Sequence, residues 1–449
     1  MAAKREHFAS SITAMSALAG SAIGLGNIWR FPYITGQNGG AAFILIYLFC
    51  VLFLAVPIML CETVIGRNAG ANTFRSLEKL APGTAWKWLG LLTVLTPLII
   101  LSYYSVVGGW SIHYFAKSLI SGFSAENADL FASFNSSIWM PLLSHTVFLG
   151  ITALIVLRGV KKGIELFNKF SIPVLFALIL AIAVYSVTLP GAEEGVRYLV
   201  KPDFKSVNAD TFISALGQAF FSLSLGVGTV LTYSSYMKKD GDILKVSAGT
   251  ALADMIFAVV AGFAIMPAVF ASGMEPGIGP GLIFETLPFI FVKLGIAAPV
   301  LSRIMSVLFF LTIVVAALTS SISMFEVGVA YLVEERKISR RKAVLRIFIG
   351  TWLLGALCSL SFGPLSGMKL FGLTLFSLCD MVTSNFLMTF GALLFVIFTG
   401  WKLDRELVRN EFTNNGSIRF NNRIFGPLYF QIRYIEPIVI LVIFLFAIN

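Results

Sequence analysis

The sequence predicts an all-α integral membrane protein, and three features of the chain lead to this prediction. Hydrophobic residues make up 57% of the 449 residues, while charged residues make up only 12%. Soluble domains carry roughly twice that share of charge, about 25%. The apolar residues gather in runs long enough to cross a bilayer, which takes about 20 residues. Two of these runs are interrupted by glycine-rich stretches that lie about two hundred residues apart.

Eleven apolar runs reach or approach spanning length, and the last of them is short. Their approximate bounds are 10–34, 39–66, 88–117, 138–157, 163–189, 211–237, 246–272, 297–333, 343–361, 369–400 and 434–448. Basic residues precede the first run and follow every second run, whereas the loop 118–137 has none. By the positive-inside bias, we expect a cytoplasmic N-terminus and a C-terminus outside the cell membrane. The net charge of +10 then reflects topology, and no nucleic-acid partner is expected.

Several other protein classes are disfavoured. The first apolar run lacks a signal-peptide cleavage pattern and continues into Arg30 and Pro32, so we expect it to remain as a membrane helix. The four cysteines lie in apolar runs without a CxxC spacing, which implies neither a disulfide framework nor a zinc site. No nucleotide-binding glycine motif follows a plausible strand, which argues against an ATP-driven pump.

The first glycine-rich stretch, Gly20–Asn27, lies inside the first apolar run and is followed by Trp29-Arg30-Phe31-Pro32. Each of its three glycines costs a helix about 1 kcal/mol relative to alanine, so the helix is expected to break there. An unwound backbone at membrane depth is tolerated only where protein or a watery cavity satisfies its polar groups. The stretch therefore predicts a binding site inside the membrane.

A second break is expected at Ser222–Gly228, in the sixth apolar run. Paired glycine-interrupted segments in the two halves of a chain indicate the binding site of a secondary transporter. The alternative is that the glycines only let neighbouring helices pack closely. Because both stretches combine glycine with serine or asparagine, we favour the binding site.

Oxygen-bearing side chains near the breaks suit a small hard cation, whereas half-helix N-termini suit an anionic group. The candidates are Asn27, Ser222, Ser224, Asp254 and the cluster Thr319-Ser320-Ser321. Asp254 is the most informative, because a carboxylate inside a membrane span is costly and therefore indicates a functional site. It could instead face a cytoplasmic vestibule or stay protonated. The serine and threonine hydroxyls could instead bond to carbonyls of their own helix.

These residues resemble the neurotransmitter:sodium symporter family. The matching stretches are Lys4-Arg5-Glu6-His7, Gly20–Asn27, Arg30-Phe31-Pro32, Asn38-Gly39-Gly40, Tyr103-Tyr104, Gly217-Gln218, Phe220–Gly228, Tyr233–Tyr236 and Leu318–Ser321. The resemblance implies the LeuT fold, with two inverted five-helix repeats, discontinuous helices 1 and 6, and one accessory helix. The repeats would cover residues 1–190 and 191–400, followed by a cytoplasmic loop and helix 11 in 401–449. Most relatives have twelve spans, so contacts made through a twelfth helix are not implied here.

The resemblance also implies two sodium sites. The residues for the first site are Ala22, Asn27, Ser222 and Asp254, together with the substrate carboxylate. Many relatives have Asn in place of Asp254 and an acidic residue or chloride one turn on, where this chain has Ala258. Asp254 would supply that negative charge, so no chloride requirement is expected. The residues for the second site are Gly20, Ile23, Ala316, Thr319 and Ser320. Release from the second site is linked in relatives to unwinding of helix 5 between a glycine and a proline, here Gly163 and Pro173.

The implied substrate site is largely apolar. Its residues would be Leu25, Gly26, Ile100, Tyr104, Phe221, Ser222, Ser224, Val227, Ser320 and Met324. Gly24 stands where the family's monoamine carriers have Asp, so the substrate must bring its own carboxylate. Val227 replaces a phenylalanine of the family's leucine carrier, which leaves room for an aromatic side chain. One buried methylene is worth only about 0.8 kcal/mol, so broad specificity is expected.

Two gates are implied as well, because an ion pair in water is weak enough to open reversibly. The outer-gate residues would be Arg30 and Asp380, with Phe221 and Tyr104 as a lid. The inner-gate residues would be Arg5 and Glu334, supported by Ser235 and Tyr236. Arg5 could instead be an ordinary topogenic charge.

The sequence therefore predicts a sodium-coupled symporter of hydrophobic L-amino acids, working by alternating access, with two Na⁺ sites. One alternative is an amino-acid sensor or channel on the same fold without coupled transport. An amine or osmolyte carrier is disfavoured by Gly24, and an enzyme by the lack of a nucleophile–base or metal constellation.

Overall fold

The computed structural model describes residues 6–123, 130–273 and 282–448, and these ranges are almost entirely helical. In the labels used below, η marks π-helical segments and the 3-10 segment η5. The N-terminal half contains α1 (Ser11–Ala22), η1 (Gly26–Arg30), α2 (Phe31–Gln37), α3 (Ala41–Cys50), η2 (Val51–Ala55), α4 (Val56–Ala69), α5 (Thr73–Leu80), α6 (Lys87–Ile120), α7 (Leu130–Ser136), α8 (Trp139–Leu157), η4 (Val160–Glu165), α9 (Leu166–Val187), α10 (Ala192–Val200) and η5 (Phe204–Ser206). The C-terminal half contains α11 (Ala209–Ser222), α12 (Thr229–Ser234), α13 (Ile243–Ala271), η6 (Leu282–Thr286), α14 (Leu287–Ala297), α15 (Pro299–Glu335), α16 (Arg340–Leu360), α17 (Leu375–Met381), η7 (Val382–Leu387), α18 (Met388–Ile397), η8 (Phe398–Lys402), α19 (Arg405–Thr413), α20 (Arg419–Phe430), η9 (Gln431–Ile435) and α21 (Glu436–Ile448).

The described residues contain nine helical segments that are long and apolar enough to cross a membrane. The broken pair α1 and η1–α2, bent by 56°, makes a tenth. The predicted sixth run consists of two shorter helices, α11 and α12, joined by a coil. The predicted bounds of the last run, 434–448, were too short, because the helical span extends over Arg419–Phe446. Its first part alternates arginine with aromatic residues, which lowers its hydropathy although it is amphipathic and helical.

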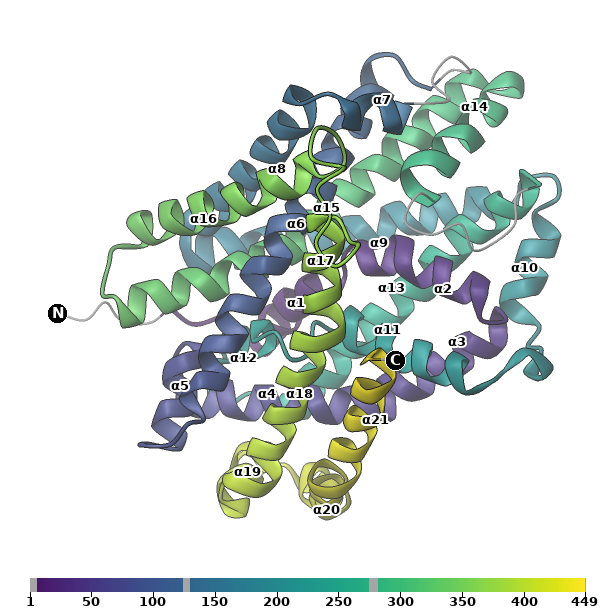
Figure 1. Cartoon of the computed structure of the whole chain (residues 1–449). Helices are drawn as coiled ribbons and strands as arrows, with labels where there is room; N and C mark the ends of the chain where they lie inside the picture. Colours follow the sequence, from purple (N-terminus) through teal and green to yellow (C-terminus); the bar gives the residue numbers. More distant parts are fainter. Residues whose placement is uncertain (1–5, 124–129, 274–281, 449) are drawn as a thin grey trace.

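Helix α1 lies near the middle of the molecule (Figure 1). It contacts α13, α9, α15 and α12. The long helices α6 and α15 pack along each other, and α6 also packs against α8 and α16. This arrangement buries the C-terminal half of α1, Ala17–Ala22, so the break at its end lies inside protein rather than in lipid.

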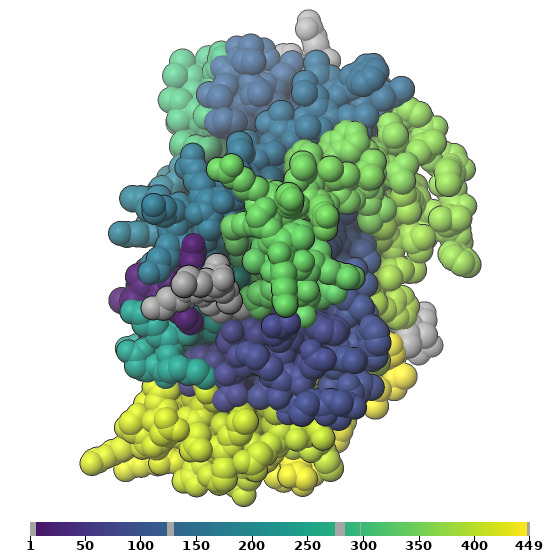
Figure 2. Space-filling model, turned by 90° about the vertical axis from the view of Figure 1, so that its left-hand side faces the viewer, coloured from purple at the N-terminus to yellow at the C-terminus, as the bar shows by residue number. Residues whose placement is uncertain are grey.

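Side chains that face outward from this core are apolar, as a lipid environment requires. Phe170 and Leu154 are each 63% exposed although both are strongly hydrophobic. In the span formed by η4 and α9, only 33% of the most apolar stretch is buried inside the protein. Figure 2 views the face that bears the purple N-terminal segment; the indigo region that includes α5 lies below the centre, and the yellow-green region of α19 and α20 forms the bottom edge.

Both predicted breaks are present. The helix α1 ends at Ala22, and the chain resumes helical structure only at Gly26. Between α11 and α12, the coil contains three residues with positive φ, namely Ser224 at 53°, Gly226 at 79° and Gly228 at 71°. A Cβ on Gly226 would lie 2.0 Å from the carbonyl oxygen of Met388. The close approach to α18, together with the left-handed backbone, therefore requires glycine at this position.

Candidate functional site

A cavity lies between the two breaks, and every residue that the sequence assigned to the substrate site lines it. The lining residues are Ser21, Ala22, Gly24, Leu25, Gly26, Ile100, Tyr104, Phe221, Ser222, Ser224, Val227, Ser320, Met324 and Met388. Met388, at the start of α18, is an apolar wall residue that the sequence did not indicate. The break of helix 1, the coil after α11 and the helices α6 and α15 thus meet around one partly open cavity.

At one end of this cavity, three side chains form a closed hydrogen-bonded group. Asn27 Nδ2 donates to Asp254 Oδ1 over 2.7 Å and to Ser222 Oγ over 3.1 Å. Ser222 Oγ donates to Asp254 Oδ2 over 2.7 Å. All three side chains are almost completely buried, with Asp254 0% exposed. Asp254 thus lies at the breaks and does not face an open vestibule.

Backbone groups of the first break add to this donor set. Asn27 Oδ1 accepts a hydrogen bond of 3.1 Å from the Gly24 amide and so holds the broken segment in shape. Ala22 is the last residue of α1, so its carbonyl lies among the helix-end groups without an intrahelical partner. Carboxylate, amide, hydroxyl and carbonyl oxygens make up the set, which suits a hard cation such as Na⁺.

The structure brings together four of the five residues of the second predicted cation site, namely Ile23, Ala316, Thr319 and Ser320, whereas Gly20 lies against Asn168. Thr319 Oγ1 donates to the Ile23 carbonyl over 3.1 Å, and Ser320 Oγ lies 3.4 Å from the same oxygen. Thr319 Oγ1 is also 2.8 Å from the carbonyl of Ala316 on its own helix. Helix α15 is therefore joined to the break of helix 1 by hydroxyl groups. The alternative, a hydrogen bond from Thr319 to a carbonyl of its own helix, is present as well.

Tyr104 and the glycines shape the cavity beside these clusters. The Leu25 amide donates to the Tyr104 hydroxyl over 3.2 Å, which leaves the hydroxyl hydrogen available for another acceptor. A Cβ on Gly24 would lie 2.4 Å from Ser320 Oγ, and one on Gly26 would lie 2.9 Å from the Phe221 ring. A larger residue at either position would therefore intrude on the space next to the breaks.

The outer-gate residues approach one another without forming an ion pair. Arg30 donates to Gln218 Oε1 over 2.9 Å, and its guanidinium lies 4.7 Å from the centre of the Phe221 ring. Asp380 Oδ1 instead accepts from Ser384 Oγ over 3.0 Å. Ion pairs within 4.0 Å among the described residues do not include Arg30 with Asp380.

The inner-gate residues cannot be joined to Arg5, which lies outside the described residues. Glu334 Oε2 accepts from the backbone amide and the side-chain amide of Asn72, over 2.9 and 3.0 Å. Ser235 Oγ donates to the Thr232 carbonyl. The Tyr236 hydroxyl donates to Glu326 Oε1 over 2.8 Å.

Comparison with known proteins assigns the family. The profile of the sodium:neurotransmitter symporter family matches residues 5–137 and 129–449. The chain belongs to this family. A sodium-dependent transporter of Bacillus subtilis, YhdH, is 38% identical over 98% of the chain and 97% of its own length. A sodium-dependent transporter of Haemophilus influenzae is 33% identical, over 98% of both chains.

The fold comparison agrees with the sequence comparison. The crystal structure of MhsT in complex with L-phenylalanine superposes with a TM-score of 0.89 at 39% identity, covering 99% of this chain and 100% of that one. The protein is therefore a multi-pass, sodium-dependent transporter of the sodium:neurotransmitter symporter family with the LeuT fold, and not an enzyme.

Three buried groups around the site of this symporter escaped the sequence analysis. The Tyr47 hydroxyl lies 3.4 Å from Asp254 Oδ2. Glu62 Oε1 accepts from the Gly226 amide over 2.8 Å and so braces the second break from α4. Glu326 pairs with Arg340 as well as with Tyr236. The signal for both glutamates was available, since a carboxylate inside an apolar span is itself an indication of function.

Of the two predicted helix-5 residues of the symporter, only Gly163 lies where the helix type changes. Gly163 belongs to the π-helical turn η4, while Pro173 lies within α9. A Cβ on Gly163 would lie 2.1 Å from the Ile155 carbonyl oxygen. The proline removes one helical hydrogen bond. The helix-5 segment is therefore irregular at the π-helical turn and again at Pro173.

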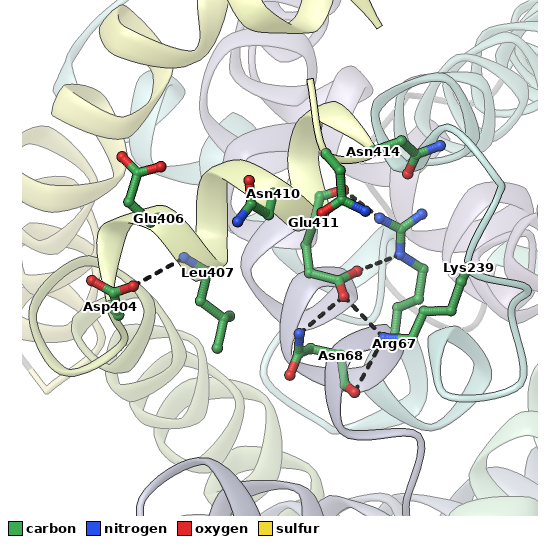
Figure 3. A pocket seen from close by; sticks show the side chains of 10 residues that line it. Arg67, Asn68, Lys239, Asp404, Glu406, Leu407, Asn410, Glu411 and Asn414 are labelled. Atoms are coloured by element: carbon green, nitrogen blue, oxygen red, sulfur yellow. Dashed lines mark hydrogen bonds and ion pairs between the residues drawn. The ribbon is translucent and has the colours of Figure 1, made fainter. Parts of the chain in front are cut away.

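A separate polar cavity of about 380 Å³ lies beside α19, away from the substrate cavity (Figure 3). Glu411 is its central residue. It accepts from Arg67 Nε over 2.6 Å and from Lys239 Nζ over 2.9 Å. Asn68 donates to the same carboxylate over 2.9 Å. The segment between helices 10 and 11 of the symporter, which contains α19, is thereby joined to the end of α4 and to the loop after α12.

Proposed function

We propose that this symporter couples the movement of Na⁺ to the uptake of hydrophobic L-amino acids, including aromatic ones, without a chloride requirement. The observation that supports this proposal is the two-sided cavity between the breaks. One side carries the Asn27–Ser222–Asp254 group and free backbone ends, and the other side is apolar, with Ile100 and Val227.

The polar side fits the backbone part of an amino acid. The Tyr104 hydroxyl, which accepts from the Leu25 amide and keeps its own hydrogen for another acceptor, is suited to a carboxylate, which would also ligate the sodium held by Asn27 and Asp254. The C-terminal end of α11 carries partial negative charge, which suits the ammonium group. Since the carboxylate ligates the ion, sodium and substrate would each raise the affinity for the other by the same factor.

The apolar side fits a large hydrophobic side chain. Ile100, Val227 and Met324 line this side of the cavity, and none of them offers a charge or an amide to a polar substrate. Valine at position 227 leaves free the space that a phenylalanine side chain would fill. The similarity to MhsT, whose structure was solved with L-phenylalanine, supports aromatic substrates. Gly24 supplies no carboxylate for an amine, which argues against an amine carrier.

The proposed independence of chloride rests on Asp254. Its carboxylate accepts two hydrogen bonds of 2.7 Å at the first cation site. Ala258, one turn on, is fully buried and offers no charge. One fixed negative charge beside the sodium therefore makes an added anion unnecessary.

The proposed orientation places the N-terminus in the cytoplasm. The ammonium of Lys238 donates to the Ala9 carbonyl over 2.6 Å, so the basic loop after α12 lies on the same face as the N-terminal segment. Both would therefore meet the cytoplasm, in line with the positive-inside bias.

The test is uptake of tritiated phenylalanine into proteoliposomes with an inward sodium gradient. We expect accumulation that needs sodium, persists when gluconate replaces chloride, and is inhibited by leucine and tryptophan but not by γ-aminobutyrate. Sodium-dependent binding without accumulation would favour a sensor, and uptake that stops without chloride would overturn the role given to Asp254.

A further inference from the structure

Glu436, in helix α21, is a fully buried carboxyl group that the transport sites do not use. Its side chain is 0% exposed, although it lies in a segment that spans the membrane. One oxygen, Oε1, accepts a hydrogen bond of 2.7 Å from Gln431 Nε2. The other oxygen, Oε2, has no hydrogen-bond partner among the described residues. The ion pairs of the described residues do not include Glu436 either.

The carboxyl group lies where three spans meet, and each of them contains a π-helical turn. These turns are η2 before α4, η8 after α18 and η9 before α21. The segment η9 packs against η8, α18 and α4. Gln431 also donates to the carbonyl of Phe53 in η2, so its amide joins helix 2 to the carboxyl group of helix 11. Such turns are frequent at functional sites.

The titratable and charged groups around this junction offer no cation to a carboxylate. From α4, the Cys61 thiol lies within electrostatic range of both Glu436 and Glu62, and Glu62 is itself acidic. From η8, the uncharged Thr399 lines the same small cavity as Cys61. From η9, the Arg433 guanidinium is stacked 4.6 Å above the Trp401 ring instead of pairing with Glu436.

An isolated carboxylate in such a place is strongly disfavoured, because a buried charge needs a counter-charge or full hydrogen bonding. A carboxylic acid is neutral and carries a donor of its own. We propose that Glu436 is a proton-binding site, in which a proton from water adds to Oε2 and the resulting neutral acid lets helix 11 pack against helices 2 and 10. The site is separate from the cation and substrate sites and does not depend on the proposed substrate.

This assignment predicts that acid conditions stabilise the junction and alkaline conditions loosen it. Removing the proton leaves an unpaired charge between three helices, so Glu436 must reach water and the Gln431 link to Phe53 must open. The amide variant Glu436→Gln keeps the shape and neutrality of the acid but cannot titrate. It therefore mimics the protonated state at every pH.

The experiment compares the full-length wild type with Glu436→Gln and, as a matched control, Glu406→Gln, at an exposed position of α19. Thermal unfolding and sodium-driven phenylalanine uptake are measured from about pH 5 to about pH 9, so that the range extends to both sides of neutral pH. We expect the unfolding temperature and uptake of the wild type and of Glu406→Gln to fall toward alkaline pH. Glu436→Gln should retain both. The infrared band of a protonated carboxyl should also be lost in Glu436→Gln alone.

Coinciding pH profiles of wild type and Glu436→Gln, or an unchanged carboxyl band, would overturn the proposal. If Glu436→Gln does not fold, Glu436→Asp replaces it, since aspartate still titrates at a displaced position. The expected result is then a displaced pH midpoint of unfolding, and a midpoint equal to that of the wild type contradicts the assignment. Loss of uptake at every pH with an unaltered unfolding profile would also contradict it, because the substrate site and not the junction would then be affected.

Discussion

Replacement of Asp254 by Asn tests the first cation site most directly. The substitution keeps the size of the side chain and one oxygen acceptor, but it removes the negative charge. In the structure, Asp254 accepts from Asn27 and Ser222 over 2.7 Å each, and none of the basic side chains that the structure describes is bonded to it. Its charge is therefore free to act on a cation in the same group.

The magnitude follows from electrostatics. Two unit charges about 4 Å apart attract by about 4 kcal/mol at an effective dielectric constant near 20. The amide oxygen of Asn retains roughly half of that attraction as a dipole, so we expect a loss of about 2 kcal/mol. Each 1.4 kcal/mol changes an affinity by about tenfold, so the sodium affinity should fall about 30-fold.

The assay is a sodium titration of tritiated phenylalanine binding to purified protein, with and without chloride. Asp240→Asn is the matched control, because Asp240 is exposed in the loop after α12. We expect Asp254→Asn to need about 30-fold more sodium, with part of the affinity restored by chloride. A sodium midpoint equal to that of the control would refute the role of Asp254.

Three further variants test the second cation site, the substrate pocket and the polar cavity beside α19. Thr319→Ala combined with Ser320→Ala removes both hydroxyls that reach the Ile23 carbonyl, so the sodium titration should shift to higher concentration; an unshifted titration would reject the second site. Val227→Phe should reduce tryptophan binding more than leucine binding in a competition assay, because the larger side chain fills the space for an indole; equal losses would contradict the size argument. Burial acts to raise the pKa of Glu411, but the charges of Arg67 and Lys239 outweigh it and place the pKa below its usual range. The stabilisation is therefore present above the unfolded-state pKa, about 4.3, and is lost as the pH falls through the lower folded-state pKa. Glu411→Gln should destabilise the protein by about 3 kcal/mol at neutral pH, because Arg67 stays buried without its counter-charge, and should flatten the acid side of a denaturation profile. An unchanged profile would argue against that pairing.

The predicted breaks depended on local chemistry, which is why they were found without coordinates. Glycine weakens a helix wherever it stands, so Gly20–Asn27 and Ser222–Gly228 both mark unwound backbone. The alternative of glycine used only for close packing is partly present too, since Gly226 touches the backbone of α18. The break and the close contact are compatible at this position, because both require the missing side chain.

The contacts that the sequence analysis missed join residues far apart in the chain. Tyr47 and Asp254 are separated by 207 positions, and Glu62 and Gly226 by 164. No periodicity within one helix indicates such a pairing. The bounds of the last span were also missed, because arginines in an amphipathic segment lower the local hydropathy without breaking the helix.

The sequence by itself determined the membrane class, the position of both breaks and the oxygen-rich character of the site, because apolar length, glycine content and side-chain chemistry are local properties. Only the tertiary structure decided that Asn27, Ser222 and Asp254 form one closed group, that Arg30 and Asp380 stay apart, and that Glu436 is enclosed by three helices. Each of these outcomes depends on how helices from distant parts of the chain pack, and packing brings together charges and hydrogen-bonding groups that no stretch of sequence holds side by side.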